Sequence, residues 1–240
     1  MKRPSRPLQI AIDGPVSAGK GTVARSLAER LGIVYVDTGA MYRSAALLAQ
    51  SSGIPLEDSS SVVTLLSQAR IEIRPPTLEE QDGRLTTVLL NGEDVSWKIR
   101  GEAVGLGASI ISQHPEVRAI LVARQREMVA GQSVVMEGRD ITTRVLPDAP
   151  FRIFLTASPE VRARRRQQQL RERGIGLSYK KVLADLRRRD EQDSARKADP
   201  LRVAHGAWVL DTSDLTIQQV VERIVDKIEK SGLLSGGEEV

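Results

Sequence analysis

A glycine-rich segment near the start of the chain has the spacing of a phosphate-binding loop. Residues 14–22 fit Gly-x4-Gly-Lys and lie between an apolar run and a helical pattern. Glycines let successive backbone N–H groups converge on phosphate oxygens, and the N-terminus of the following helix adds partial positive charge. Lys20 would then reach the β and γ phosphates of a nucleotide. The expected donor-binding residues are Gly14, Pro15, Val16, Ser17, Ala18, Gly19, Lys20, Gly21 and Thr22.

One position departs from the usual form of this loop. Ser or Thr commonly follows the lysine directly, whereas Gly21 here separates Lys20 from Thr22. This order weakens the assignment of Thr22 as a ligand of Mg²⁺. The later apolar run 134–137 ends without an Asp-Glu pair, so no side-chain metal ligand is assigned. We expect Mg²⁺ to be held mainly by nucleotide phosphates and water.

The composition fits a globular protein and excludes several kinds of chemistry. The 240 residues are 40% hydrophobic and 28% charged, which is ordinary for a folded domain. Cysteine is absent, which excludes disulfide scaffolds, thiol nucleophiles and cysteine-based zinc sites. A net charge of +4 and a pI near 9.6 imply an anionic partner, either nucleic acid or small phosphates.

The N-terminal segment is too short to predict a secretory or membrane segment. Its cationic start is followed by an apolar stretch that Gln9 interrupts and Asp13 ends. No apolar run approaches the ~18 residues that a membrane span needs. We therefore expect a cytoplasmic protein that does not contact membranes, with flexible tails at residues 1–7 and 231–240.

Alternating strand and helix patterns predict an α/β fold. Short apolar runs, typical of buried strands, are separated by longer helical patterns. Such strands favour a parallel sheet, here of five strands, with helices on both faces. The expected strands are residues 8–13, 33–37, 134–137, 151–155 and 207–210. The main expected helices are residues 20–31, 39–50, 159–173, 178–196 and 216–230.

One stretch interrupts this alternation. Residues 70–96 contain short β-like runs and the dipeptide Asn91-Gly92, which favours a two-residue hairpin turn. We therefore expect a small antiparallel β insertion in the α/β core. Two further helices are expected over residues 99–112 and 116–130.

Several later motifs accompany the glycine-rich loop in a fixed order. They are Asp37-Thr-Gly-Ala-Met-Tyr-Arg43, Asn91-Gly-Glu-Asp-Val95, Ile99-Arg100, Val117-Arg118, Arg124-Gln-Arg126, Glu137-Gly-Arg-Asp140 and Arg189-x3-Asp193-x2-Arg196. With Gly-Lys-Gly-Thr in the loop, which occurs in the nucleoside monophosphate kinase branch of P-loop proteins, they resemble the cytidylate kinase family of single-chain bacterial type. The resemblance covers residues 8–230 as a single kinase domain. It implies transfer of the γ-phosphoryl group of ATP to CMP or dCMP, with Mg²⁺ as the accompanying metal ion.

The resemblance also implies roles for individual residues. Residues 39–130, with the β insertion, would bind the acceptor, and residues 158–178 would form a helical lid over ATP. The acceptor phosphate would be held by Thr38, Arg43, Arg139 and Arg196, the ribose by Arg189 and Asp193, and the base by Ser109, Arg118 and Asp140. The lid arginines Arg162 and Arg165 would bind ATP. The catalytic groups would be Lys20, Arg139, Arg166 and Arg189. A loose phosphoryl-transfer transition state needs positioning and positive charge rather than a covalent nucleophile.

Hydrogen bonding explains why such a site would prefer cytosine. Cytosine offers an N4 amino donor beside the N3 and O2 acceptors. Asp140 and Ser109 would accept from N4, and Arg118 would donate to N3 and O2. Uracil presents O4 and a protonated N3 instead. Because unpaired buried polar groups cost about 1–3 kcal/mol each, we expect UMP to be disfavoured by roughly tenfold or more.

Simpler interpretations stay open. Any single arginine could lie on a solvated helix face, and Asp140 could cap a helix. The acceptor could be UMP, AMP or a metabolite hydroxyl, although the base-binding set would then have no evident use. The arginine-rich segment 162–202 could bind nucleic acid, but its only aromatic residue is Tyr179, and single-strand binders interleave aromatics. We therefore expect small nucleotides as partners, no nucleic acid, and a monomer.

A second departure from the family lies beside Asp140. After Gly-Arg-Asp the family commonly carries an aliphatic residue and then glycine, whereas here Ile141 is followed by Thr142. A glycine at that position could serve an unusual φ angle or a close backbone approach. The backbone just after Asp140 is therefore the part of the site that the resemblance predicts least well.

Overall fold

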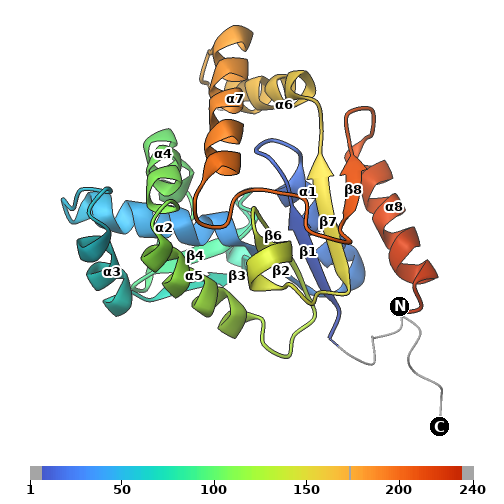
Figure 1. The fold of residues 1–240 in the computed structure, drawn as a ribbon, viewed down its shortest axis with the longest axis horizontal. Helices are drawn as coiled ribbons and strands as arrows, with labels where there is room; N and C mark the ends of the chain where they lie inside the picture. The colour runs from blue at the N-terminus through green and yellow to red at the C-terminus, as the bar shows by residue number, and fades with distance from the viewer. Residues whose placement is uncertain (1–6, 173, 234–240) are drawn as a thin grey trace. The chain divides into compact units, whose positions relative to one another are not determined.

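The computed structural model describes residues 7–172 and 174–233 (Figure 1). The flexible tails expected at 1–7 and 231–240 lie outside those residues, apart from Pro7 and a turn at 231–233. The α/β fold class is confirmed, because strands and helices alternate and a small antiparallel sheet interrupts the alternation. Within the described part of the chain, no helix is both long enough and apolar enough to cross a membrane.

The chain divides into two compact units. The P-loop unit is Met1–Val34 with Gly131–Val240, and the middle unit is Tyr35–Ala130. The P-loop unit is therefore built from two segments that are distant in sequence. The Leu8 N–H joins them by donating to Ser133 Oγ at 2.9 Å.

A parallel sheet, five-stranded in the described residues, carries the glycine-rich loop. Its strands are β1 (Gln9–Asp13), β2 (Val34–Asp37), β6 (Val134–Gly138), β7 (Phe151–Thr156) and β8 (Trp208–Asp211). They lie in the order β2-β6-β1-β7-β8. The last residue of β1, Asp13, pairs with Gly138 on one side and Phe154 on the other. All five predicted strands are confirmed, each bound shifting by at most one residue.

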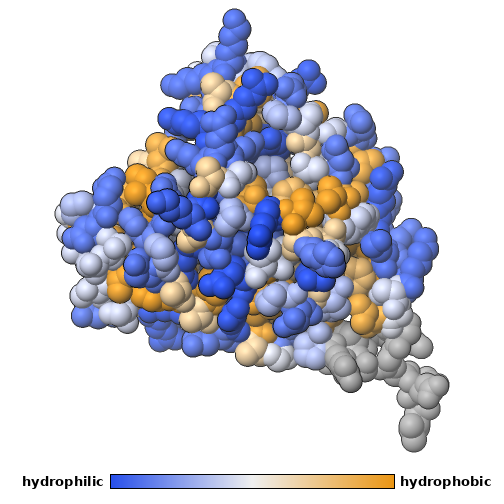
Figure 2. Space-filling view, viewed as in Figure 1, coloured by the Kyte–Doolittle hydropathy of each residue, from blue (hydrophilic) through white to orange (hydrophobic). Residues whose placement is uncertain are grey.

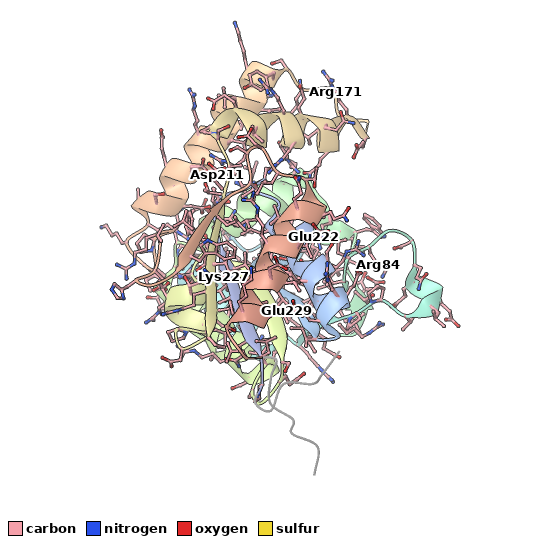
Figure 3. The ribbon with its side chains drawn as sticks, turned by 90° about the vertical axis from the view of Figure 1, so that its right-hand side faces the viewer. Arg84, Arg171, Asp211, Glu222, Lys227 and Glu229 are labelled. Atoms are coloured by element: carbon pink, nitrogen blue, oxygen red, sulfur yellow. The ribbon has the colours of Figure 1, made fainter. Side chains whose placement is uncertain are left out.

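Two helices of the P-loop unit pack together, and one of them also packs on the parallel sheet. α1 (Lys20–Leu31) starts directly after the glycine-rich loop and packs on β1 and β6. α8 (Ile217–Lys230) packs against α1 and buries one apolar face. That face consists of Val220, Val221, Ile224, Val225 and Ile228. Figure 3 shows Glu222, Lys227 and Glu229 along the same helix, where all three side chains are exposed. The last helix predicted over residues 216–230 is therefore confirmed, and it is amphipathic.

Two charged helices of the P-loop unit pack against each other. They are α6 (Pro159–Glu172) and α7 (Tyr179–Ala195). A small apolar cluster of Ala163, Leu170, Val182 and Leu186 joins them. The rest of their surface is polar, and Figure 2 shows mostly hydrophilic residues at the top of the view, where Figure 1 places these helices. They correspond to the two helices predicted over 159–173 and 178–196, of which residue 173 lies outside the described residues.

The middle unit is a helical unit with a small sheet. Its helices are α2 (Thr38–Ser51), α3 (Ser59–Gln68), α4 (Glu102–Ile111) and α5 (Pro115–Met128). α2 and α4 lie close together because Gly107 has no side chain. A Cβ at Gly107 would lie 2.9 Å from Gln50 Nε2 and 3.2 Å from Ala46 Cβ. The predicted helices over 99–112 and 116–130 are confirmed, although a short 3-10 turn, Lys98–Arg100, precedes α4.

The β insertion is also confirmed. Its strands β3 (Ile71–Arg74), β4 (Thr87–Leu90) and β5 (Glu93–Asp94) form an antiparallel sheet, with a 3-10 turn at Leu78–Glu80 between the first two. Asn91 and Gly92 have φ angles of 52° and 86°, as the tight turn between β4 and β5 requires.

Two elements were not predicted from the sequence. One is α3, which starts at Ser59 and buries Val62 and Leu66; the Asp58 side chain caps it by accepting from Ser61 N–H. The other is a π-helical turn, Ile141–Val145, directly after Asp140. The first two N–H groups of this turn donate to the Asp13 carboxylate, a contact that is distant in sequence.

Candidate active site

The glycine-rich loop has the strained backbone that phosphate binding needs. Gly14, Ser17 and Gly19 have φ angles of 151°, 61° and 91°, so their N–H groups take directions that ordinary residues seldom allow. A Cβ at Gly14 would lie 2.0 Å from Leu155 O of β7, so this position admits only glycine. Gly19 stands at the N-terminus of α1 without a side-chain cap. That end of the helix is therefore suited to an anionic ligand.

The protein's own side chains hold the carbonyl groups of this loop. Lys20 Nζ donates to Pro15 O at 2.9 Å, Arg162 Nη1 donates to Val16 O at 3.2 Å, and Thr212 Oγ1 donates to Ala18 O at 3.4 Å. In a trans peptide the C=O and N–H groups point in opposite directions. The N–H group that follows each of these three carbonyls therefore points away from the side chain that binds the carbonyl. A phosphate cradle requires N–H groups that are left available in this way.

Lys20 is the buried cation of the loop. Its side chain is only 5% exposed, and Glu137 Oε2 lies 4.0 Å from its Nζ. Burial and the nearby Arg139 lower the pKa of Lys20 to about 7, although Glu137 and the more distant carboxylates of Asp193 and Asp13 oppose this shift. A neighbouring anion would remove the penalty on the charged form.

Arg139 and Asp193 form the tightest charge pair near Lys20. Arg139 Nε donates to Asp193 Oδ2 at 2.6 Å. Burial alone would raise the pKa of Asp193, but the charges of Arg139, Arg196 and Arg189 outweigh it and hold that pKa below its usual range. Burial alone would likewise lower the pKa of Arg139, and Asp193 and Glu137 reverse the shift. Arg196 Nε donates to the backbone O of Asp193 at 3.3 Å. Four of the predicted site arginines and carboxylates thus gather in one unit with Lys20.

Asp13 is a buried carboxylate that the sequence analysis did not assign. Its Oδ1 accepts from Ile141 N–H and its Oδ2 from Thr142 N–H, both at 2.8 Å, and Oδ2 also accepts from Thr142 Oγ1. Burial raises the pKa of Asp13, against the effect of these bonds and of Lys20. These contacts resolve the backbone after Asp140, where Thr142 replaces the expected glycine: Thr142 is held by hydrogen bonds, not by an unusual φ angle.

Asp140 lies at the start of the π-helical turn. Its side chain is 5% exposed and makes no capping bond, whereas its backbone O accepts from Arg144 N–H at 2.8 Å. Asp140 is therefore not the side-chain helix cap that the sequence left open as an alternative.

The two lid arginines predicted to bind ATP are anchored within the P-loop unit. Arg162 is 4% exposed; its guanidinium bonds to Ala157 O and to both Asp190 oxygens, at 3.1 and 2.7 Å, besides Val16 O. Arg165 donates to Thr212 Oγ1 and O at 3.0 and 2.7 Å, and burial lowers its pKa. The third predicted lid arginine, Arg166, lies half-buried one turn after Arg162. That Arg162 and Arg165 bind ATP, and that Arg166 takes part in catalysis, stay predictions.

In the middle unit, the carboxylate of Asp37 binds two arginines, Arg43 and Arg100. Asp37 caps α2 by accepting from Ala40 N–H at 3.1 Å, and its Oδ2 accepts from Arg43 Nη2 at 2.7 Å and from Arg100 Nη1 at 3.2 Å. Burial would raise the pKa of Asp37, but the two arginines outweigh it and lower that pKa. A Cβ at Gly39 would lie 3.2 Å from Arg43 Nη1, so glycine leaves room for the guanidinium. Two guanidiniums on one carboxylate leave net positive charge for an anion.

The predicted acceptor-binding residues of the middle unit lie on three helices. Thr38 is buried at the start of α2, beside Asp37. Arg118, on α5, is 2% exposed; its Nη1 donates to Ser112 O at 3.3 Å and its guanidinium lies 5.6 Å from the centre of the Tyr42 ring. Ser109, on α4, donates to Gly105 O at 3.3 Å. Arg118 is therefore a buried cation, not a solvated surface arginine.

Sequence reasoning missed three contributors to these clusters, namely Asp13, Asp37 and Arg100. Asp37 and Arg100 stand inside motifs that carry the resemblance, yet their roles depend on contacts between distant positions. The signal for Asp13 was its position as the last residue of a buried strand, next to the glycine-rich loop. Burying a carboxylate at such a position costs free energy unless hydrogen bonds compensate for it. A buried Asp there therefore indicates that nearby groups donate hydrogen bonds to it.

A strained glycine loop, a buried lysine at a helix N-terminus and arginine–carboxylate pairs beside parallel strand ends define a P-loop phosphotransferase. The sequence model of the family described as cytidylate kinase matches residues 10–230. The chain therefore belongs to the cytidylate kinase family and is a nucleotide-binding kinase, for which the family implies ATP as co-substrate.

Individual relatives agree with this family. The chain is similar to the cytidylate kinase of Caldanaerobacter subterraneus subsp. tengcongensis, with 47% identity over 93% of this chain and 96% of the relative. It is 46% identical to the cytidylate kinase of Geobacillus kaustophilus over 94% of this chain and 98% of the relative. A crystal structure of an uncharacterized protein from Eubacterium ventriosum has a similar fold, with a TM-score of 0.50 and 12% identity, over 92% of this chain and 98% of that one.

Proposed function

We propose that the protein transfers the γ-phosphoryl group of ATP to CMP and dCMP, giving ADP with CDP or dCDP. One observation carries the proposal within the kinase class. Lys20, which the loop motif directs at the donor phosphates, is within electrostatic reach of Arg139, which the family resemblance assigns to the acceptor phosphate. Arg139 disfavours the charged form of the buried Lys20, and the carboxylates of Glu137 and Asp193 only partly offset this effect, so anions between the two cations would stabilise both charges. Two nucleotide phosphate groups that meet there would supply those anions.

The donor triphosphate would bind the glycine-rich loop. The N–H groups turned away from the bonded carbonyls of Pro15, Val16 and Ala18 would take phosphate oxygens. Lys20 would exchange its bond to Pro15 O for a phosphate oxygen, and the phosphate charge would raise its pKa again. Arg162 supports this role indirectly, because its bond to Val16 O ties the loop to α6 and α7 through Asp190.

The acceptor's phosphate and ribose would be bound by arginines from several segments. Arg43 and Arg100, gathered by Asp37, provide two forked donors that match phosphate geometry. The family resemblance also assigns Arg139 and Arg196 to the acceptor's phosphate. Asp193, kept ionised by its arginine neighbours, is suited to accept hydrogen bonds from ribose hydroxyls.

The base would be read by buried polar groups. Asp140 is almost fully buried and does not cap its turn, so its carboxylate is suited to accept from cytosine N4. Arg118 is equally buried and would donate to N3 and O2. Ser109 would accept from N4. Because both charges are buried, a base that could not pair with them would leave costly unsatisfied groups.

The transfer itself would be an in-line displacement. An oxygen of the acceptor's phosphate forms a bond to the γ-phosphorus while the bond to the β–γ bridging oxygen breaks, and ADP leaves with that electron pair. The protein's contribution is positioning and positive charge from Lys20, Arg139, Arg166 and Arg189. Closure of α6 and α7 would exclude water, which would otherwise compete as acceptor.

We propose that Mg²⁺ arrives with ATP. In the part of the chain that the structure describes, no three His, Cys, Asp or Glu side chains gather as a metal cage. The proposal rests on the chemistry of Mg²⁺, which keeps several waters and binds nucleotide phosphates. When bound, Mg²⁺ neutralises charge on the β and γ phosphates. Thr22, the remaining candidate of the loop, is exposed on α1.

A coupled assay of ADP release tests the proposal. The purified protein is given MgATP with CMP, dCMP, UMP, AMP or no acceptor, and kcat/KM is measured for each. We expect CMP and dCMP to be used best and UMP at least roughly tenfold less well, because uracil mispairs with Asp140 and Arg118. ATP consumption that CMP does not accelerate would contradict the proposal, and equal use of UMP would contradict the base assignment.

A further inference from the structure

The short segment that carries Arg139 and Asp140 is fastened to Asp13 at both of its ends. Before it, Gly138 at the end of β6 pairs with Asp13 of β1 in the parallel ladder. After it, the chain turns back, and the N–H groups of Ile141 and Thr142 donate to the Asp13 carboxylate. Arg139 and Asp140 are therefore the two residues between the fastened ends.

Asp13 is itself held rigidly, which makes it a firm anchor. It lies on β1 between β6 and β7 and is wholly buried. The next residue, Gly14, packs so closely on Leu155 O that no side chain fits. Asp13, which holds the Arg139–Asp140 segment, is thus directly followed by Gly14, the first residue of the phosphate-binding loop.

The Thr142 side chain adds a bond that the backbone alone does not supply. Its hydroxyl donates to the same Asp13 Oδ2 that accepts its own N–H, and the residue is 2% exposed. One residue therefore makes two bonds to one carboxylate oxygen, which fixes the rotamer of Thr142 as well as its backbone. The turn that follows closes through Leu146 N–H to Ile141 O at 2.8 Å.

We propose that Thr142 is a positioning residue for the acceptor: through Asp13, its hydroxyl fixes Arg139 and Asp140 relative to Lys20. The proposal rests on the proposed function for its kinetic consequences. Phosphoryl transfer is sensitive to small displacements of positioned groups, so a looser segment weakens acceptor binding and base selection before it affects ATP. Thr142 touches neither nucleotide in this scheme.

The test compares matched variants at two buried threonines. Thr142→Val keeps the shape and removes the hydroxyl, and Thr142→Ser restores the hydroxyl without the methyl group. Thr86→Val in the middle unit is the control, because Thr86 is also 2% exposed and its Oγ1 has no hydrogen-bond partner in the structure. KM for CMP and for ATP, the ratio of kcat/KM for CMP over UMP, and the melting temperature are measured for each.

We expect Thr142→Val to raise KM for CMP about tenfold and to lower the CMP preference severalfold, with KM for ATP unchanged. Thr142→Ser and Thr86→Val should behave as the wild type. A Thr142→Val enzyme with only a lower melting temperature, or with equal changes for ATP and CMP, overturns the proposal. If the valine variant does not fold, Thr142→Ala against Thr142→Ser repeats the same comparison.

Amide hydrogen exchange separates this proposal from the proposed function. In the ligand-free protein, the N–H groups of Ile141 and residue 142 should exchange faster in Thr142→Val than in the wild type, while those of β1 stay protected. Unchanged exchange overturns the positioning role whatever the acceptor is. A wild type that does not use CMP, but whose exchange depends on the hydroxyl as expected, contradicts only the proposed function.

Discussion

A lysine of the P-loop unit and two arginines of the middle unit hold positive charge in different ways. The P-loop unit buries a lysine, Lys20, whose pKa falls to about 7 because burial and Arg139 disfavour the ammonium form. The middle unit uses two arginines, Arg43 and Arg100, and sets a buried carboxylate, Asp37, between them. The buried lysine therefore carries a destabilised charge, whereas the two arginines, like Arg139 with Asp193 in the P-loop unit, are already paired with a carboxylate.

This difference follows from the chemistry of the two side chains. A guanidinium keeps its proton at all accessible pH values and binds phosphate in a fork, so a site built on arginine is pre-organised and insensitive to pH. An ammonium group is a compact point charge that gives up its proton when buried. We therefore expect Lys20 to gain its full charge only when a donor phosphate binds beside it. Four predictions test this contrast.

The largest effect is expected at Lys20. Lys20→Met should lower kcat by about 1,000-fold or more, because the donor phosphates lose the one lysine that the loop motif directs at them. The measurement is steady-state turnover with CMP, with circular dichroism to confirm folding. Lys98→Met, an exposed lysine of the middle unit, is the matched control and should be unchanged. A rate near the wild type for Lys20→Met would remove Lys20 from the reaction.

Loss of Arg43 should be the next largest effect. Arg43→Ala should raise KM for CMP about 100-fold and leave KM for ATP within about twofold, because a forked donor to the acceptor's phosphate is lost. Arg74→Ala is the control: Arg74 also forms an ion pair at 2.7 Å, with Glu80, but lies in the β insertion. If KM for ATP rose as much as KM for CMP, the assignment of Arg43 to the acceptor's phosphate would be wrong.

Arg100 should matter less than Arg43. Its Nη1 lies 3.2 Å from Asp37 Oδ2, against 2.7 Å for Arg43, so its guanidinium is less tightly held. We expect Arg100→Ala to raise KM for CMP about tenfold. Because both arginines share one carboxylate, the double variant should cost less than the product of the two single effects, which a double-mutant cycle measures. Independent effects would show that Asp37 does not couple them.

Local chemistry explains which features the sequence predicts well. The glycine-rich loop and the Asn91-Gly92 turn adopt positive-φ conformations that few residues other than Gly and Asn accommodate, so their positions are evident without tertiary contacts. The strands follow from short apolar runs bounded by loops. The helix α3 was missed because its serines and β-branched residues are weak helix formers, and the Asp58 cap with buried Val62 and Leu66 was the available signal.

Long-range contacts explain what the sequence could not provide. The π-helical turn after Asp140 depends on hydrogen bonds to Asp13, 128 residues away in sequence for Ile141. Arg100 acquires its role from Asp37, 63 residues earlier. The family resemblance named most candidate side chains, but only the folded chain assigns Arg162 its bonds to the loop and to Asp190. Pairings of this kind leave no local pattern, because the two partners are far apart in the sequence.

The smallest effect, and the sharpest test of the contrast, is the pH dependence of ATP binding. In the protein without ATP, the pKa of Lys20 is about 7, below its ordinary value of 10.5, and bound phosphate should raise this pKa again. ATP binding therefore takes up a proton, and affinity falls as pH rises above 7. Between pH 7.5 and 8.5, where ATP itself no longer titrates, we expect the Kd for ATP to rise about eightfold.

Calorimetry in two buffers of different ionisation enthalpy measures the proton uptake directly, and Lys20→Arg is the control. The guanidinium stays charged over this range, so its Kd for ATP should not change with pH and no proton should be taken up. The Kd for CMP, which depends on arginines, should be flat in both proteins. If Lys20→Arg kept the pH dependence of the wild type, a group other than Lys20 would be titrating. Lys20 would then already be protonated before ATP binds.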